Sequence, residues 1–447
     1  MKASARSNVV VIFADQMHRF AMGCMDNSDV ETPVLDRMAR KGTLFRNAIS
    51  STPVCSPFRV NMLSGRYGLE SGARENGCVL PPWCDSLVDD FNSAGYDTSF
   101  VGKWHVGGNG NGPVPEKVRM GFQQFIGYQC YNGFYKDVCF YDEEGTERRF
   151  KKHRTDVTMD LALERLEMLG ERPFFMVVGF QAPHYPEQPS PRFDHMYRGR
   201  SVTPRPNYDG GDPYIPTYSP RSRRPFELCP DFRRYGNDIH EYLRLYYGMV
   251  SQIDYNVGRL LEALESRGLD EDTIVVFTAD HGDLAGSHDL HGKRVSYQES
   301  VGVPLIMQGP QVPAGMVIDT PIDSCSFVPT CMEMVGVEAT ADVAERSRAA
   351  LLRGETDERP VFANLDNWCM VRRGNLKLTA EWDTCSPTML FDVEADPYEQ
   401  DNLIGKPAHA TRAAELRATL IDWRDRAVAF REAGESQARH QRPLSGK

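Results

Sequence analysis

The chain has 447 residues, of which 41% are apolar and 25% charged, and its formal net charge is -11 at pH 7. This length suits one large globular domain with a smaller unit attached. The negative charge excludes nucleic acid as a bulk electrostatic partner, so a local cluster of cations has to bind any anionic substrate.

The start of the chain gives no sign of a targeting segment. The apolar run VVVIFA ends on Asp15 and is too short for the core of a signal peptide. No other run approaches the ~20 apolar residues of a membrane span. We therefore expect a cytoplasmic protein with no membrane partner, or a periplasmic or secreted one if a leader was removed.

The 11 cysteines include no C-x-x-C pair, so neither a disulfide framework nor a structural zinc site is predicted.

Short runs of β-branched residues alternate with amphipathic segments over the first 340 residues. The predicted strands are 8–15, 98–103, 173–180, 273–280 and 303–309, and the predicted helices are 33–42, 85–95, 156–170 and 237–267. Apolar strands that alternate with helices predict an α/β fold, with a large, mainly parallel or mixed central sheet and helices on both faces. Reaction sites in such folds lie beyond the carboxyl ends of the strands.

The character of the sequence changes after about residue 340. Residues 359–403 predict a small antiparallel sheet, and a helix is predicted over 411–433, followed by a polar tail, 434–447, that we expect to be disordered. The chain is thus divided into a catalytic domain, 1–340, and a smaller C-terminal subdomain, 341–447. Residues 198–234, rich in proline and arginine, predict a long irregular excursion, either a lid over the substrate or an oligomer contact or solvated loop.

Two predicted strands end in the same way. VVVIFAD ends on Asp15, which Gln16 follows, and TIVVFTAD ends on Asp280, which His281 follows. If both strands lie centrally in one parallel sheet, the two carboxylates emerge on the same rim. Two buried carboxylates repel unless a cation lies between them, and a hard divalent metal meets that need. Alternatively, each aspartate caps the helix that follows its strand.

The stretch CSPFR, residues 55–59, places a cysteine two residues before a proline. A helix that begins near Pro57 puts Cys55 at a helix N-terminus, where the dipole favours an anion, and directs Arg59 back towards the same place. Such a cysteine is either a thiol nucleophile of low pKa or a buried structural residue. Spacing alone leaves both interpretations open.

Six stretches in order resemble one family. CSPFRVNMLSGRY is similar to the type I sulfatase signature C-x-P-x-R-x-x-x-L-[ST]-G-R of the alkaline-phosphatase-like superfamily. The other five are NVVVIFADQ, GYDTSFVGKWHVG (95–107), QAPHYP (181–186), TADHGDLAGSHDLHGK (278–293) and LFDVEADPYEQDNL (390–403). The resemblance covers nearly the whole chain. It implies that a formylglycine-generating maturation enzyme oxidises Cys55 to Cα-formylglycine, whose hydrate attacks sulfur with one hydroxyl and expels sulfate with the other.

The resemblance also implies a role for individual residues. One divalent cation is held by Asp15, Gln16, Cys55, Asp280 and His281. Gln16 departs from the family's common Asp-Asp pair, and His281 stands where many members have Asn, so Mn²⁺, Mg²⁺ or zinc competes with Ca²⁺, our first choice. Arg59 and Lys103 stabilise the transferring sulfuryl group, Lys293 and His184 contact the sulfate, and either His184 or His105 protonates the leaving alkoxide.

The expected activity is hydrolysis of a sulfate monoester on a sugar or another small organosulfate. A phosphonate monoester or phosphodiester hydrolase of the same superfamily is the alternative, because both substrate types present one negative charge to the cationic site. A third interpretation is a non-catalytic or phosphatase-like member in which Cys55 stays a thiol. Arg74, Asn76, His153, Arg154 and Tyr185 are candidates for recognition of the rest of the substrate, with a surface or loop role as the alternative.

Overall fold

A computed structural model describes residues 6–208, 225 and 233–441 and is built around a ten-stranded sheet. In spatial order its strands are β12 (Met316–Ile318), β2 (Thr43–Phe45), β11 (Leu305–Gln308), β9 (Thr273–Ala279), β1 (Asn8–Asp15), β8 (Phe174–Pro183), β4 (Asp97–Lys103), β5 (Gln124–Tyr128), β6 (Val138–Tyr141) and β7 (Glu147–Phe150). The predicted strands that carry the motifs therefore lie together in one sheet.

The centre of this sheet is parallel and its edges are mixed. Strands β9, β1, β8, β4 and β5 run parallel, whereas β11 lies antiparallel to β9, and β6 and β7 form an antiparallel edge. The predicted strand 303–309 is split into β10 (Gly302–Val303) and β11, and β10 belongs to a small separate sheet with β3 (Ala48–Ile49) and β13 (Ile322–Asp323). β1 and β8 are buried along their whole length, as a sheet covered on both faces requires.

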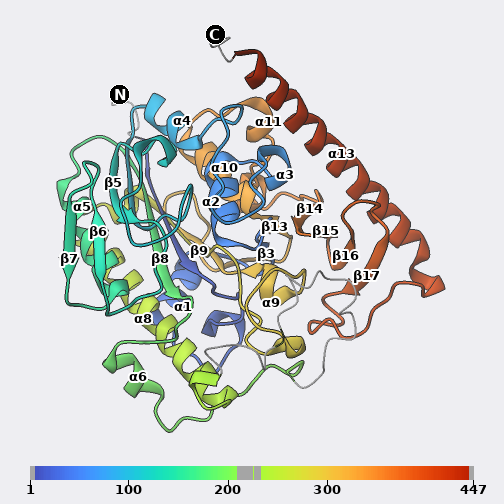
Figure 1. Ribbon diagram of the computed structural model, residues 1–447, viewed down its shortest axis with the longest axis horizontal. Coiled ribbons are helices and arrows are strands. Elements are labelled where there is room, and N and C mark those ends of the chain that lie inside the picture. Colours follow the sequence, from blue (N-terminus) through green and yellow to red (C-terminus); the bar gives the residue numbers. More distant parts are fainter. Residues whose placement is uncertain (1–5, 209–224, 226–232, 442–447) are drawn as a thin grey trace, which may run out of the picture.

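Helices cover both faces of the sheet (Figure 1). On one face lie α1 (Pro33–Lys41), α5 (Arg154–Met168) and α8 (Ile239–Ser266), and on the other α2 (Cys55–Ser64), α4 (Leu87–Ser93) and α10 (Ser324–Val335). Helix α8 begins where Asp238 accepts a hydrogen bond from the His240 N–H and ends just before Gly268. Shorter helices are α3 (Gly68–Ser71), α6 (Pro191–Tyr197), α9 (Gln298–Val301), α11 (Ala341–Ala344) and α12 (Ala349–Leu352).

The predicted C-terminal sheet is confirmed. It has four antiparallel strands, β14 (Val361–Leu365), β15 (Trp368–Arg373), β16 (Leu376–Glu381) and β17 (Pro387–Asp392), and α13 (Ala410–Gln441) runs along it (Figure 1). The expected disorder of the tail is wrong for residues 434–441, because α13 continues through them. Within this extension Gly434 packs so closely against the Trp83 side chain that a β-carbon would clash.

The C-terminal sheet shares its hydrophobic clusters with the larger part of the chain. One cluster joins Trp368 and Phe391 to Val54 and Leu284, and another joins Trp423 of α13 to Tyr67. The division at residue 340 stays a prediction. Most of the excursion 198–234 lies outside the described residues. Among the helices that the structure describes, none combines the length and apolar character needed to cross a membrane.

Candidate active site

Asp15 and Asp280 emerge side by side from neighbouring parallel strands. Ala14 of β1 is in register with Ala279 of β9, so the next residue of each chain segment lies at the same rim of the sheet. The Asp280 N–H donates to the Ala14 carbonyl over 3.0 Å, which holds the two segments together beyond the strand ends. The expected convergence of the two carboxylates follows from this register.

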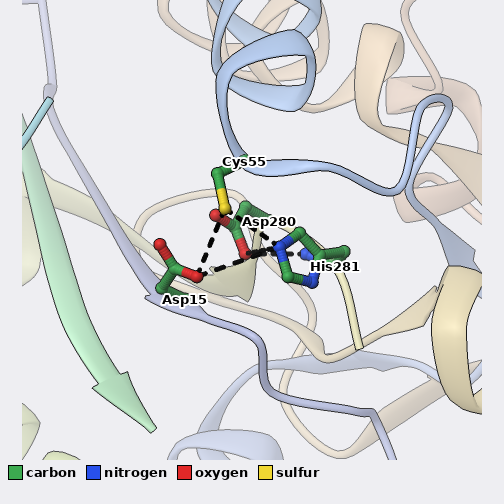
Figure 2. Close-up of side chains that lie close together, drawn as sticks. All are labelled: Asp15, Cys55, Asp280 and His281. Atoms are coloured by element: carbon green, nitrogen blue, oxygen red, sulfur yellow. Dashed lines mark hydrogen bonds and ion pairs between the residues drawn. The ribbon is translucent and has the colours of Figure 1, made fainter. Parts of the chain in front are cut away.

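Cys55 is the first residue of α2 and is directed at the two carboxylates. Its Sγ lies 3.6 Å from Asp15 Oδ1 and 3.3 Å from His281 Nε2. Burial raises the pKa of its thiol, but the charges of Lys293 and Lys103 lower the pKa well below the ordinary value. Figure 2 shows the side chains of Asp15, Cys55, Asp280 and His281 pointing towards one another.

These four side chains form a donor set that fits a cation. One potential ligand atom from each lies within 4.8 Å of every other, and all four residues are buried. The His281 Nδ1 is 2.9 Å from the Gly282 carbonyl, which can only accept, so Nδ1 carries a proton, and the neutral imidazole would present the Nε2 lone pair to the cluster. Burial, and then the charge of Asp15, raise the pKa of Asp280 to about 6. The two carboxylates repel each other, and a divalent cation among the four donors would relieve that repulsion.

Two cations also face this cluster. The Arg59 Nη2 lies 3.0 Å from Asp15 Oδ2 and 3.2 Å from Asp280 Oδ2, and the Lys103 Nζ lies 2.6 Å from Asp15 Oδ2. Arg59 follows Cys55 by one helical turn, so both side chains project from the same face of α2. Lys103 is the last residue of β4 and reaches the same rim as Asp15. Both cations are buried, so solvent screens their attraction to the carboxylates less than it would at the surface.

Gln16 adjoins the cluster mainly through a network that sequence reasoning missed. Its N–H donates to Asp280 Oδ1 over 3.0 Å, its Nε2 donates to Asp283 Oδ2 over 2.7 Å, and its Oε1 accepts from Lys293 Nζ over 2.5 Å. Asp283 also accepts from the Tyr242 hydroxyl. The repeated aspartate of the sequence DHGD was the available signal for Asp283. Ligation of the cation by Gln16 stays a prediction.

The two candidate proton donors differ in their surroundings. Burial lowers the pKa of His184 well below its ordinary value, and Lys293 and Lys103 lower it further. Burial also opposes protonation of His105, but its hydrogen bonds with the thiols of Cys130 and Cys55 raise its pKa to about 9. Its Nε2 lies 2.8 Å from Asn109 Oδ1, a partner that sequence reasoning missed. The two imidazoles therefore favour opposite protonation states near neutral pH.

Two of the five candidates for recognition of the rest of the substrate are structural. His153 and Arg154 are buried at the start of α5, where Arg154 donates to the carbonyls of Gly133 and Asp137. Tyr185 is 42% exposed beside His184. The Asn76 Oδ1 accepts from the Ser56 N–H at the start of α2, and Arg74 lies over the Trp382 ring. His153 and Arg154 thus have neither a surface role nor direct access to a ligand.

The family model for sulfatases matches residues 7–337, and a model described as N-sulphoglucosamine sulphohydrolase, C-terminal, matches residues 286–426. An ulvan-active sulfatase of Formosa agariphila is 30% identical over 434 residues, covering 93% of this chain and 80% of that protein. An N-acetylglucosamine-6-O-sulfatase of Bacteroides thetaiotaomicron is 26% identical, covering 93% of this chain and 86% of that protein.

The fold has close matches among solved structures. A protein solved in complex with its substrate D-glucosamine-2-N,6-O-disulfate superposes with a TM-score of 0.83 at 23% identity, covering 94% of this chain and 98% of the other. The strand ends, the C-x-P-x-R helix and the buried donor set occupy one site in the present chain. This protein belongs to the sulfatase family of the alkaline-phosphatase-like superfamily and is a sulfuric ester hydrolase.

Proposed function

We propose that this protein hydrolyses a sulfate monoester on a sugar, with Cys55 converted to Cα-formylglycine. The observation that carries the proposal is the position of the Cys55 thiol, in contact with Asp15 and His281 inside the buried donor set. This position places the side chain of residue 55 beside the donors that would hold a divalent cation, and such a cation would lower the pKa of a hydroxyl on the formylglycine hydrate. The relative named for N-acetylglucosamine-6-O-sulfate supports a saccharide as the sulfated alcohol.

We assign the divalent cation to Asp15, Gln16, Cys55, Asp280 and His281, with Ca²⁺ as first choice. When bound, such an ion lowers the pKa of a coordinated hydroxyl and polarises the sulfate oxygens. Arg59 and Lys103 hold the Asp15 carboxylate and offset charge that develops on the sulfuryl group. Lys293, beside Gln16, supplies a further positive charge for the sulfate.

The leaving alkoxide needs a proton, and we assign its transfer to His105. Against the opposing effect of burial, the hydrogen bond with the Cys130 thiol, which does not depend on Cys55, raises the pKa of His105 and favours the protonated imidazole that a general acid requires. His184, whose pKa is lowered, stays neutral and donates from Nδ1 to the Tyr185 carbonyl over 3.0 Å. In this assignment His184 binds the sulfate and His105 protonates the ester oxygen.

Mass spectrometry of the tryptic peptide 47–59 tests the nucleophile. When the protein is produced together with a maturation enzyme, conversion of Cys55 should lower the peptide mass by about 18 Da. The matured protein should hydrolyse sulfated monosaccharides and 4-nitrophenyl sulfate, and Cys55→Ala should abolish turnover without unfolding the protein. An unconverted peptide under these conditions would count against the proposed chemistry.

A matched pair of substrates separates the two candidate reactions. The same matured preparation is assayed with 4-nitrophenyl sulfate and with a phenylphosphonate ester, and kcat/KM should be higher for the sulfate. A higher kcat/KM for the phosphonate ester would favour the phosphonate monoester hydrolase. Screening sulfated glucosamines and galactoses then identifies the sugar and the sulfated position.

A further inference from the structure

The turn between β14 and β15 lies against the segment that carries Lys293. Asp366, in this turn, forms a two-pronged ion pair with Arg294: the Arg294 Nε lies 3.1 Å from Asp366 Oδ2, and its Nη2 contacts Asp366 Oδ1. The side chains of Arg294 and Asp366 are only 5% and 8% exposed. A buried pair with this bidentate geometry restricts both partners more tightly than a surface pair does.

The backbone of Arg294 adopts a conformation that needs such support. Its φ is 90°, in the left-handed region that residues other than glycine rarely adopt. The Trp368 indole N–H donates to the Arg294 carbonyl over 2.8 Å, and Trp368 is fully buried in β15. The C-terminal sheet therefore holds the Arg294 carbonyl and pairs with its side chain, and Glu75 contacts the same guanidinium over 3.2 Å. Together these contacts support a backbone conformation that is unfavourable for arginine.

This support bears directly on the neighbouring residue, Lys293. Lysine has a flexible four-carbon stem, so the position of its ammonium group depends on the position of its backbone. In the structure the Lys293 Nζ reaches Gln16 Oε1 over 2.5 Å, at the edge of the donor set. The Asp366 carbonyl also accepts from Arg74 Nη2 over 3.3 Å, so the same turn contacts a second segment near the start of α2.

We propose that Asp366 is a positioning residue for sulfate ester hydrolysis, because its ion pair with Arg294 holds the backbone from which Lys293 enters the active site. This inference rests on the proposed role of Lys293 in binding the sulfate. It assigns the C-terminal sheet a part in the reaction, through the contact of Asp366 with Arg294.

A double-mutant cycle tests the proposal. The matured full-length protein and its variants Asp366→Asn, Lys293→Ala and the double variant are assayed with 4-nitrophenyl sulfate. We expect Asp366→Asn to lower kcat/KM about 10- to 100-fold when Lys293 is present. When Lys293 is replaced, the same change should alter kcat/KM by less than about twofold, because the residue acts through Lys293. The metal content of Asp366→Asn should equal that of the protein without this substitution, both when Lys293 is present and when it is replaced by alanine.

A matched control separates positioning from general destabilisation. Arg348 and Asp357 form an equally buried pair, 5% exposed on each side, and Asp357 also pairs with the more exposed Arg359. Within the described residues, these contacts of Asp357 involve no residue assigned to the site. Asp357→Asn should lower the melting temperature as much as Asp366→Asn but leave kcat/KM within about twofold. If Asp366→Asn fails to fold, Trp368→Phe takes its place in the cycle, since it removes the indole N–H and keeps an aromatic ring.

The possible outcomes distinguish this inference from the proposed function. An equal loss of kcat/KM from Asp366→Asn with and without Lys293, or no loss at all, would overturn the positioning role. Full activity of Lys293→Ala would instead overturn the proposed role of Lys293, and the inference would fall with it. Loss of metal from Asp366→Asn would also contradict the proposal, because the turn would then support the cation.

Discussion

At the scale of single residues, the site depends on charges that balance only when they are brought together. Asp15 and Asp280 are buried beside each other, and Arg59 links them through one guanidinium nitrogen. Each group alone would be costly to bury, because an unpaired charge loses its hydration. Substitutions at this site should therefore change cation binding and activity together.

Asp280→Asn should remove the cation. An amide keeps the shape of the side chain but loses the charge that attracts a divalent ion, so kcat/KM should fall at least about 100-fold. Metal content is measured by atomic spectroscopy, and activity with 4-nitrophenyl sulfate. Asp254→Asn, a change at a buried aspartate outside the site, is the control and should retain the metal. An Asp280→Asn protein that keeps one ion per chain would move the metal site elsewhere.

His105→Gln and His184→Gln should respond differently to the leaving group. If His105 protonates the leaving oxygen, His105→Gln should lower kcat/KM about 100-fold or more on a sugar sulfate, because an alkoxide is a poor leaving group. The decrease in kcat/KM should be much smaller on 4-nitrophenyl sulfate, because nitrophenolate leaves without a proton. His184→Gln should lower kcat/KM on both substrates by a similar factor. Equal losses for His105→Gln on both substrates would contradict its assignment.

At the scale of elements, α8 supports α1 through one carboxylate. The Asp254 side chain of α8 accepts from the N–H groups of Val34 and Leu35, over 3.2 and 2.8 Å, at the start of α1. Burial, opposed by these two hydrogen bonds, raises the pKa of Asp254 to about 7. The contact joins two helices on one face of the sheet that lie about 220 residues apart in sequence.

Asp254 should make the stability of the protein depend on pH. Because its folded pKa lies above the unfolded value, the folded state binds more protons between about pH 4 and pH 7, so the free energy of unfolding falls as pH rises through this range. Asp254→Asn should flatten that decline, measured as melting temperature from pH 5 to pH 8. Glu262→Gln, on the exposed side of α8, should leave the slope unchanged. An unaltered slope in Asp254→Asn would contradict the raised pKa.

At the scale of the whole molecule, the C-terminal part is packed into the rest of the chain. The Trp423 ring of α13 stacks on Phe362 with centroids 4.8 Å apart and meets Tyr67 edge-on at 5.3 Å. Tyr67 directly follows the C-x-P-x-R signature and its L-S-G-R continuation. Folding of the C-terminal sheet and of the segment around the nucleophile is therefore coupled through shared apolar contacts.

Trp423→Ala should destabilise the entire protein in one step. Loss of a buried tryptophan costs about 3–5 kcal/mol of unfolding free energy, and the shared clusters predict a single cooperative transition in both proteins. Denaturation by urea, followed by tryptophan fluorescence and circular dichroism, measures both properties. Arg426→Ala, on the same helix, should change stability little. Two separate transitions would show that the C-terminal part unfolds independently.

The sequence by itself determined the α/β fold, the strands that lead to Asp15 and Asp280, and a helix with Cys55 at its N-terminus, although the helix begins at Cys55 rather than near the predicted Pro57. These features follow from local periodicity and from short motifs, both of which depend on residues that are close together in the sequence. The small C-terminal sheet was predictable for the same reason. The convergence of Asp15, Cys55 and Asp280 was predictable only because parallel strands release their last residues on one rim.

Only the tertiary structure decided the contacts between distant segments. The bonds from Gln16 to Asp283 and from Arg294 to Asp366 join residues 267 and 72 positions apart, and no local pattern specifies such pairs. The antiparallel direction of β11 and the extension of α13 past residue 433 likewise depend on neighbours far away in the chain. Local propensity decides which segments form helices and strands. Packing decides which of these elements contact each other, because burial of apolar surface stabilises the arrangement that the whole fold allows.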